Sequence, residues 1–322
     1  MKARIYTADH RMFDLPPLLD WRITYTGGVP CDSYRVRFLF RREMAEVLRL
    51  AAGFAVLDSN GGFLLRATVD EYTLGLDGGG LTATVLGRGL AARLLDNESR
   101  PVTYQGVTLE EIIRSHVEPY GITCREAAHL RADSVYTVAA GSSQWKALEG
   151  FCRAYGGFVP RFTREGELLA LPETETRRIT VNENNALLAC TLREDHYGVL
   201  TEALVIDKTR NQSYSVKNQD WIDRGGQCRR VLYTPGQSTW AAMRYTGEYQ
   251  IARSQEEAWT LTLTLPGCFH AFPGDRAEVD LPRLDLRGVY RVAEAENRSG
   301  GQEGSQSVLI LKPLPEKTAG TA

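Results

Sequence analysis

Apolar and polar residues alternate with a period of two along much of the first third of the chain, a pattern typical of β-strands with one buried face. The strands predicted here are 21–26, 33–39, 54–57, 63–69, 71–76 and 81–86, of which 54–57 is apolar throughout. Turns rich in Asn, Asp and Gly, which tolerate a positive φ, join the last four into two pairs at 59–62 and 77–80. We therefore predict a meandering antiparallel sheet that is long enough to curl into a barrel.

One segment in this part of the chain has helical spacing instead. Met44, Val47, Leu48 and Ala51 lie three or four positions apart, so their apolar side chains would share one face of a helix. The sequence therefore predicts a helix over residues 41–52, set between strands.

The middle of the chain begins with a clear helix signal. Thr108 and Glu111 have the spacing of a capping box directly before an apolar run, which marks the start of a helix. The apolar residues of the run are Ile112, Ile113 and Val117. The helix should stop by the segment Pro119-Tyr120-Gly121.

A second helix is predicted to begin at Ser142 or Ser143 and to end at the glycine pair 156–157, a suitable C-terminal cap. Its apolar stripe consists of Trp145, Leu148, Cys152 and Tyr155. Because these positions share one face, we expect that face to be buried.

The last third of the chain returns to strands. Trp259, Leu261, Leu263 and Leu265 alternate strictly with threonines, and this predicts a half-buried strand. Further strands are predicted at 276–281, 288–295 and 305–312, with an exposed hairpin tip at 299–304 and a frayed tail after Pro313. Residues 237–253 fit a helix or a strand equally well.

Between these parts, a hairpin over 161–171 and a polar, Pro-led linker over 172–178 are expected. The fold class that follows is α+β, mostly β. We predict two β-barrel domains at 1–96 and 176–322, with a small helix-containing α+β domain inserted at 97–175.

The composition limits the classes of function. Hydrophobic residues make up 43% and charged residues 24%, as in globular proteins. The 38 basic and 40 acidic side chains nearly cancel, which argues against a protein whose main partner is nucleic acid. The apolar runs are too short to cross a membrane and the first residues are too polar for a secretory signal, so we expect a soluble protein made without secretory export.

The cysteines do not form a metal knuckle or a redox pair. The six are Cys31, Cys124, Cys152, Cys190, Cys228 and Cys268, far apart in the sequence and without a C-x-x-C spacing. We expect reduced, mostly buried thiols. Cys152, on the apolar stripe of its predicted helix, is interpreted as a buried thiol and not as a nucleophile.

The histidines also lack the spacing of a reactive or metal site. They are His10, His116, His129, His196 and His270. Asp195 and His196 would point to opposite faces if they lie on a strand, and Ser238 lacks the second glycine of a nucleophile elbow and is expected in a turn over 236–240. We therefore predict no catalytic, cofactor-binding or metal-binding residues and no enzymatic activity.

Four segments in a fixed order carry a family resemblance. They begin GRGLAARLLD at residue 87, VTLEEII at 107, GSSQWKALEGFC at 141 and FPGDRAEV at 272. Together they resemble the baseplate hub proteins of contractile phage tails, the late control protein D family. The resemblance spans residues 30–312.

The resemblance implies a structural role. Family hubs form a trimeric ring with two tail-tube-like barrels per chain, which adapts the sixfold tail tube to the threefold central spike. The implied partners are the chain itself, the tail tube protein and the central spike protein, with tape measure and baseplate wedge proteins as further contacts. DNA would be a transient passenger through the lumen, and no membrane and no cofactor are implied. The expected location is the baseplate of a virion or phage-tail-like particle, assembled in the bacterial cytoplasm.

Two alternatives stay open. One is a particle-associated cell-wall hydrolase, which would need a reactive dyad that the sequence does not reveal. The other is a β-rich carbohydrate-binding or adhesin protein, which would present aromatic side chains such as Trp221, Trp240 and Trp259 on its sheets.

Overall fold

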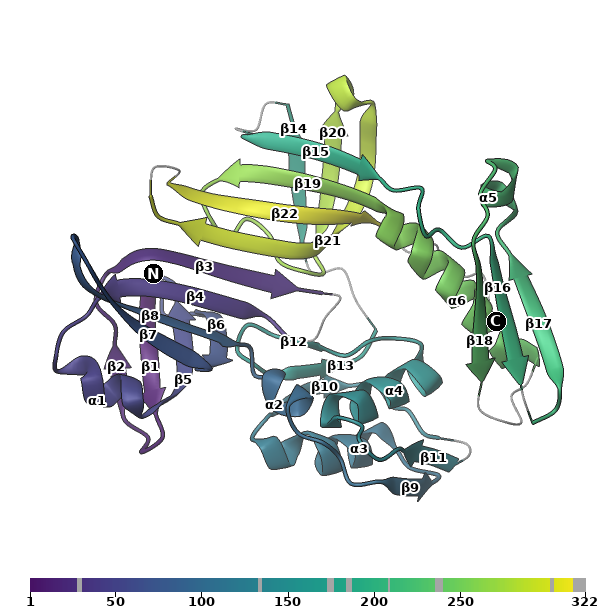
Figure 1. The fold of residues 1–322 in the computed structure, drawn as a ribbon, viewed down its shortest axis with the longest axis horizontal. Helices are drawn as coiled ribbons and strands as arrows, with labels where there is room; N and C mark the ends of the chain where they lie inside the picture. The colour runs from purple at the N-terminus through teal and green to yellow at the C-terminus, as the bar shows by residue number, and fades with distance from the viewer. Residues whose placement is uncertain are drawn as a thin grey trace. The chain divides into compact units, whose positions relative to one another are not determined.

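The chain divides into two compact units (Figure 1). The computed structural model describes residues 1–27, 31–132, 135–172, 177–183, 187–207, 209–234, 240–301 and 304–314. Unit 1 contains Met1–Arg177, Pro266–Asp275 and Ala293–Val308, and unit 2 contains Arg178–Leu265, Arg276–Val292 and the chain from Leu309 on. The three domains expected at 1–96, 97–175 and 176–322 remain a prediction.

The predicted fold class, α+β and mostly β, is confirmed. Strands account for 49% of the structure and helices for 20%. Both hairpins expected in the first third are present, with turns where the Asn- and Gly-rich segments were expected.

The first ninety residues of unit 1 contribute to two antiparallel sheets. The first has the order β2-β1-β5-β6, with the bounds Met12–Asp14, Lys2–Thr7, Ala51–Leu57 and Phe63–Thr68. The second begins β7-β8-β4-β3, with the bounds Glu71–Asp77, Gly80–Arg88, Ser33–Leu39 and Leu18–Thr26. Beside β3 lies the second half of β21 (Leu286–Ser299), followed by β22 (Ser305–Pro313); both strands run through the two units.

The two sheets of unit 1 enclose one core. The rings of Tyr34 and Phe54, from different sheets, stack with centroids 3.9 Å apart. The Tyr34 hydroxyl donates to the Thr68 carbonyl at 2.9 Å, and an isolated bridge joins Ala67 to Gly89. These contacts therefore join the two sheets along one side, as expected if the antiparallel strands curl toward a barrel.

The helix predicted over 41–52 is wrong at both ends. The helix α1 covers only Met44–Arg49, with Val47 and Leu48 buried. Ala51 already pairs with Thr7 as the first residue of β5. The apolar segment after the helix belongs to a strand, because pairing with β1 satisfies its backbone groups while its side chains enter the core.

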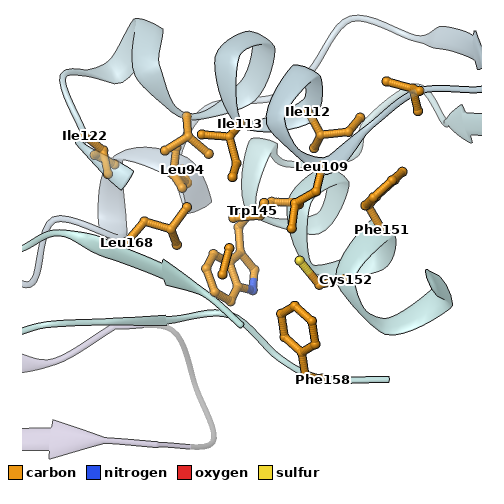
Figure 2. Close-up of a cluster of buried hydrophobic side chains, with 14 of the residues drawn as sticks. Leu94, Leu109, Ile112, Ile113, Ile122, Trp145, Phe151, Cys152, Phe158 and Leu168 are labelled. Carbon is orange, nitrogen blue, oxygen red and sulfur yellow. The ribbon is translucent and has the colours of Figure 1, made fainter. Parts of the chain in front are cut away.

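The rest of unit 1 is a small α+β layer around a helical core (Figure 2). Its helices are α2 (Ala92–Leu95), α3 (Leu109–His116), η1 (Glu118–Tyr120) and α4 (Gln144–Gly156). Its strands are β9 (Val102–Gln105), β10 (Cys124–Ala127), β11 (Val135–Val138), β12 (Arg161–Phe162) and β13 (Leu168–Ala170). Leu109, Ile112, Leu148, Phe151 and Leu168 are fully buried in this core.

The predicted capping box is confirmed. The Glu111 backbone N–H donates to Thr108 Oγ1 at 3.3 Å, and the Thr108 N–H donates to the Glu111 carboxylate at 2.8 Å. Ser143 caps α4 through its hydroxyl alone, which accepts from the Lys146 N–H at 3.2 Å, and Gly157 ends the helix with a φ of 67°. Both helices therefore begin where local hydrogen bonding predicts.

Unit 2 contains a second sheet region. Its strands are β14 (Arg178–Asn182), β15 (Ala189–Glu194), β19 (Trp259–Pro266), β20 (Arg276–Leu281) and the unit 2 halves of β21 and β22. The order is β15-β19-β22-β21, and β20 pairs with both β21 and β14. The alternation predicted for β19 is confirmed, since Leu261 and Leu263 are fully buried.

A second layer of unit 2 has the strand order β17-β16-β18. The bounds are Gln212–Lys217, Glu202–Asp207 and Arg229–Thr234, accompanied by α5 (Gln219–Asp223) and α6 (Trp240–Ala258). The short η2 (Pro282–Leu284) connects β20 to β21 in the other sheet of unit 2. Residues 240–253 of the undecided segment are thus helical. Gly247 approaches Val216 and Val205 so closely that a Cβ there would lie 2.5 Å from Val216. The buried side of α6 includes a glycine, which interrupts the helical spacing of apolar residues. The sequence pattern therefore did not identify this segment as a helix.

Three expectations fall mostly outside the described residues: the turn at 236–240, the linker at 172–178 and the tail after Pro313.

Candidate assembly surface

The thiols are less buried than expected. All six cysteines are free, but only Cys152 is buried and the other five are half-buried. Burial raises the pKa of Cys152 and of Cys31 to about 12. The expectation of mostly buried cysteines was wrong; Cys124, for example, is the first residue of β10, and Cys268 lies in a bend two residues beyond the end of β19. A raised pKa lowers the thiolate fraction that a nucleophile needs.

Asp195 and His196 do not lie on a strand, so the expectation that they point to opposite faces of one does not apply. They follow β15, where the Asp195 carboxylate accepts from the Tyr197 N–H at 3.1 Å and pairs with Arg193 at 2.6 Å. These two contacts lower the pKa of Asp195. The His196 ring packs edge-on against Trp221 at 5.5 Å. The carboxylate thus orders a turn.

The buried His116 also has structural partners. Its ring nitrogens lie 2.6 Å from the Gln144 amide oxygen and 3.0 Å from the Tyr104 hydroxyl. Within the ranges that the structure describes, no group of three or more His, Cys, Asp or Glu residues is arranged to hold a metal ion.

The tryptophans proposed for a carbohydrate-binding surface lie in different settings. Trp221 belongs to α5 and Trp240 is the first residue of α6. Trp259 lies on a strand, where it stacks on Tyr290 with centroids 4.9 Å apart. They do not form one aromatic face of a sheet.

The most exposed strand of unit 1 is β7. Among the described residues it is hydrogen-bonded only to β8 and ends its sheet, and all seven of its residues are exposed. Tyr72 and Leu74 pair with Val85 and Ala83, which are fully buried, so they extend the core-facing side of the sheet beyond its covered part. Leu76 continues this row and is 80% exposed.

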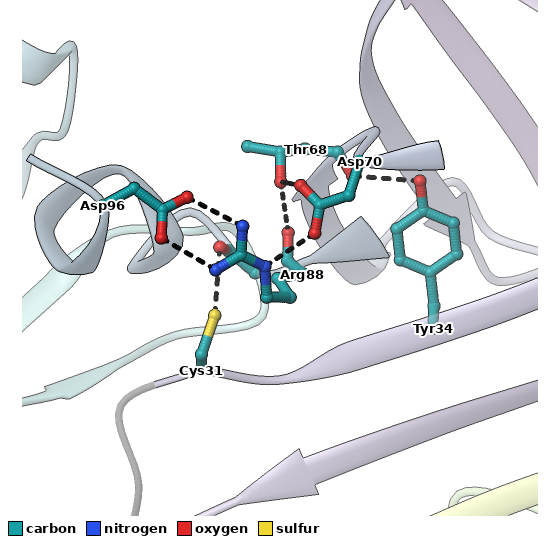
Figure 3. Close-up of polar contacts among 7 residues, drawn as sticks. Cys31, Tyr34, Thr68, Asp70, Arg88 and Asp96 are labelled. Atoms are coloured by element: carbon teal, nitrogen blue, oxygen red, sulfur yellow. Dashed lines mark hydrogen bonds and ion pairs between the residues drawn. The ribbon is translucent and has the colours of Figure 1, made fainter. Parts of the chain in front are cut away.

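An ion-pair cluster fixes the start of β7 (Figure 3). Arg88 Nε donates to Asp70 at 2.6 Å, and the other guanidinium nitrogens donate to both oxygens of Asp96 at 3.0 and 2.7 Å. These carboxylates raise the pKa of Arg88, and Arg88 lowers that of Asp96. Thr68 Oγ1 donates to the Arg88 carbonyl at 2.9 Å. The cluster holds β6, β7 and α2 around the end of β8.

Gly87 makes this arrangement possible. A Cβ on Gly87 would lie 2.1 Å from the Thr68 carbonyl oxygen, a distance that no side chain tolerates. The glycine at the start of the segment GRGLAARLLD is thus required by the close approach of β6 to β8.

Unit 2 has a comparable edge at β15. This strand pairs with β19 and ends its sheet among the described residues. Cys190 and Leu192 lie opposite the buried Leu263 and Leu261, and both are only half-covered. The exposed Thr191 and Arg193 occupy the other face.

Both edge strands have properties typical of sheet edges to which a further strand is added. Neither contains proline or lysine, and each keeps an apolar row next to open backbone groups. Such edges add strands from a partner by main-chain hydrogen bonding. The sequence indicated that 71–76 is a strand, but no signal in it identified the strand as the last of its sheet.

In the part of the chain that the structure describes, none of the helices combines the length and apolar character needed to cross a membrane.

Comparisons with known proteins identify the fold. No family model and no curated protein matches the sequence. A 43 kDa tail protein of prophage MuSo2 from Shewanella oneidensis is 13% identical with a TM-score of 0.80, and the match covers 97% of this chain and 98% of that one. A tail protein from Neisseria meningitidis MC58 is 15% identical with a TM-score of 0.76, covering 97% and 96%.

A third match is an Escherichia coli component of the type VI secretion system that exhibits structural similarity to the bacteriophage T4 tail proteins gp27 and gp5. It is 9% identical with a TM-score of 0.55 and covers 93% of this chain and 74% of that one. Over nearly its whole length, this chain has the fold of phage tail proteins.

Proposed function

We infer that this protein is a structural component of a phage-like tail, namely the baseplate hub of a contractile tail or tail-like injection particle. The observation that carries the proposal is the fold match with two tail proteins, which spans 97% of the chain in each case. A match of this extent leaves little of the chain for a separate catalytic domain. The similar structures are tail proteins, which supports a role without enzymatic activity.

The exposed sheet edges support assembly with other subunits. Tyr72, Leu74 and Leu76 are 41%, 45% and 80% exposed on a strand that is open on one side. An apolar free edge in a single chain is a site of aggregation unless a partner covers it. A closed ring of identical subunits covers such edges without leaving new ones.

We propose that the ring is a trimer. Each chain has one β-rich region in each unit, so three copies would present six such regions to a sixfold tail tube and threefold symmetry to a central spike. The similarity of the Escherichia coli protein to the tail proteins gp27 and gp5 supports a role as a component of a tail or tail-like particle. Membership in the late control protein D family stays part of this proposal.

The proposed partners are the chain itself, the tail tube protein and the central spike protein, with tape measure and wedge proteins beyond them. The formal net charge of -2 fits a wall past which DNA moves without being held. The proposed location is the baseplate of a particle assembled in the bacterial cytoplasm.

Two measurements test the proposal. In sedimentation equilibrium and native mass spectrometry, the purified chain should be a trimer, or a monomer that forms trimers when tube or spike protein is added. A stable dimer would count against a hub. In electron micrographs of assembled particles, a tagged copy should be found at the baseplate end, and a label distributed along the tail would contradict the proposal.

A further inference from the structure

The free edges of units 1 and 2 have nearly the same length and the same division of faces. The strand β7 has seven residues and β15 has six. In each strand one face is apolar and continues a core, and the other is polar. Complementary strands of equal length can pair over their whole length, so the two edges can be compared residue by residue.

One antiparallel register aligns three alternate positions on one face of the two strands. It places Glu71 opposite Arg193, Thr73 opposite Thr191 and Gly75 opposite Ala189. Opposite charges and Thr pairs are among the favourable cross-strand neighbours. Arg193 already donates through one guanidinium nitrogen to Asp195, and its fork has further N–H donors for a second carboxylate.

The same register matches the apolar positions. Three pairs form on the other face: Tyr72 with Leu192, Leu74 with Cys190 and Leu76 with Leu188. Leu76 and Leu188 are 80% and 55% exposed, so the pairing covers large apolar side chains that this chain leaves in solvent. Removing such surface from water is the main driving force of association.

Neighbouring registers are worse. A shift by one residue turns every side chain to the wrong face. A shift by two in one direction places Glu71 opposite Asp195 and Tyr72 opposite Glu194. A shift by two residues in the other direction removes the ion pair between Glu71 and Arg193. The register with Glu71 opposite Arg193 is therefore the one that aligns both the apolar row and this ion pair; it also places Asp70, which already pairs with Arg88, opposite Glu194.

We propose that β7 of one copy pairs antiparallel with β15 of the next copy, with Glu71 opposite Arg193. This pairing rests on the proposed function, since it names the surfaces through which the ring closes. The contact is head to tail, so every copy uses its β7 edge on one neighbour and its β15 edge on the other, and the series ends only when the ring is complete.

A cross-link tests the register directly. Directly opposite residues of an antiparallel pair lie within the distance that a disulfide spans. The variant Leu74→Cys, oxidised with copper phenanthroline, should form a disulfide to the native Cys190 of the next copy. Non-reducing gels should show covalent dimers and trimers that disappear on reduction.

Two matched variants make this result specific. Adding Cys190→Ser to Leu74→Cys should abolish the cross-link. Thr73→Cys places a thiol on the neighbouring residue but on the other face of the strand, and should give no cross-link above the wild-type level. Cross-linking that persists without Cys190, or that is equal in Thr73→Cys, would overturn the register.

A charge exchange gives a second, non-covalent test. Glu71→Arg should weaken self-association about tenfold or more, because two arginines would then face each other. The double variant Glu71→Arg with Arg193→Glu should restore it. Failure of the exchange to restore association would also contradict the pairing.

Different results would contradict the β7–β15 pairing and the hub proposal. If the wild-type chain is a trimer but Leu74→Cys shows no cross-link dependent on Cys190, the pairing is wrong and the hub proposal stands. The hub proposal is wrong if the wild type does not self-associate, either alone or with tube and spike proteins, and the pairing is then wrong with it. A cross-link that forms only between this chain and a tube or spike protein would show that another occupant covers β7.

Discussion

The helical core of unit 1 and the β7 edge of the same unit use the same kinds of apolar residue in opposite ways. Leu109 and Leu148 are fully covered by their own chain, whereas Leu74 and Leu76 are 45% and 80% exposed. The helical core is complete within one chain, with its helix ends capped by local side chains. The β7 edge has an apolar row and open backbone groups that no other described residue of the chain covers. The difference separates residues that serve folding from residues that serve assembly.

The largest expected effect comes from replacing a leucine with aspartate, once in the helical core and once on β7. Leu109→Asp buries an unpaired carboxylate and should lower the free energy of unfolding by about 3–5 kcal/mol. Leu74→Asp should change the stability of the isolated chain by about 0.5 kcal/mol or less, because its side chain stays in solvent, but it should abolish self-association. Urea unfolding and sedimentation measure the two effects. Equal loss of stability in both variants would show that β7 is part of the folding core.

A smaller effect is expected where the β7 edge is anchored. Gly87→Ala forces a methyl group against the Thr68 carbonyl oxygen and should cost about 1–3 kcal/mol. Gly75→Ala lies on β7 itself, where the nearest atom is Thr82 Oγ1 at 3.5 Å, and should be nearly neutral. Thermal unfolding of the two variants compares the anchored end of the edge with its open part. A neutral Gly87→Ala would contradict the close approach of β6 and β8.

The helix cap contributes less again. Thr108→Ala removes the side chain that accepts from the Glu111 N–H and should cost about 1 kcal/mol. Thr108→Ser keeps the acceptor oxygen and should retain most of the stability. Chemical denaturation checks both, and self-association should be unchanged, because the cap belongs to the region that is complete in one chain.

The last prediction concerns pH. Burial raises the pKa of Asp32, beside β4, from 3.8 to about 7. The folded state then holds the proton more tightly than the unfolded state, so the contribution of Asp32 to stability falls as pH rises from about 4 to about 7. Asp32→Asn can still accept from the Thr26 N–H and should remove this part of the pH dependence. Melting temperatures between pH 4 and pH 8 measure the slope, and an unchanged slope in the variant would contradict the assignment.

Much of the local structure could be predicted because its causes are local. The capping box at Thr108, the glycine end of α4 and the alternation of Trp259–Pro266 depend on residues a few positions apart. The helix over 41–52 was predicted too long, since β5 competes for its last residues through pairing with β1. The helix α6 was left undecided, because its buried side includes Gly247 and Ser254 and lacks a clear apolar stripe.

By itself, the sequence determined the types of most elements, the caps of α3 and α4 and the face of each strand that is apolar. Only the tertiary structure decided that β7 and β15 end their sheets, that Gly87 lies against β6 and that Asp195 orders a turn after β15. The reason is physical: the period of a strand is set by its own residues, but its neighbours are set by pairing with distant segments, as when β21 joins β3. Whether an apolar face is core or surface depends on those neighbours.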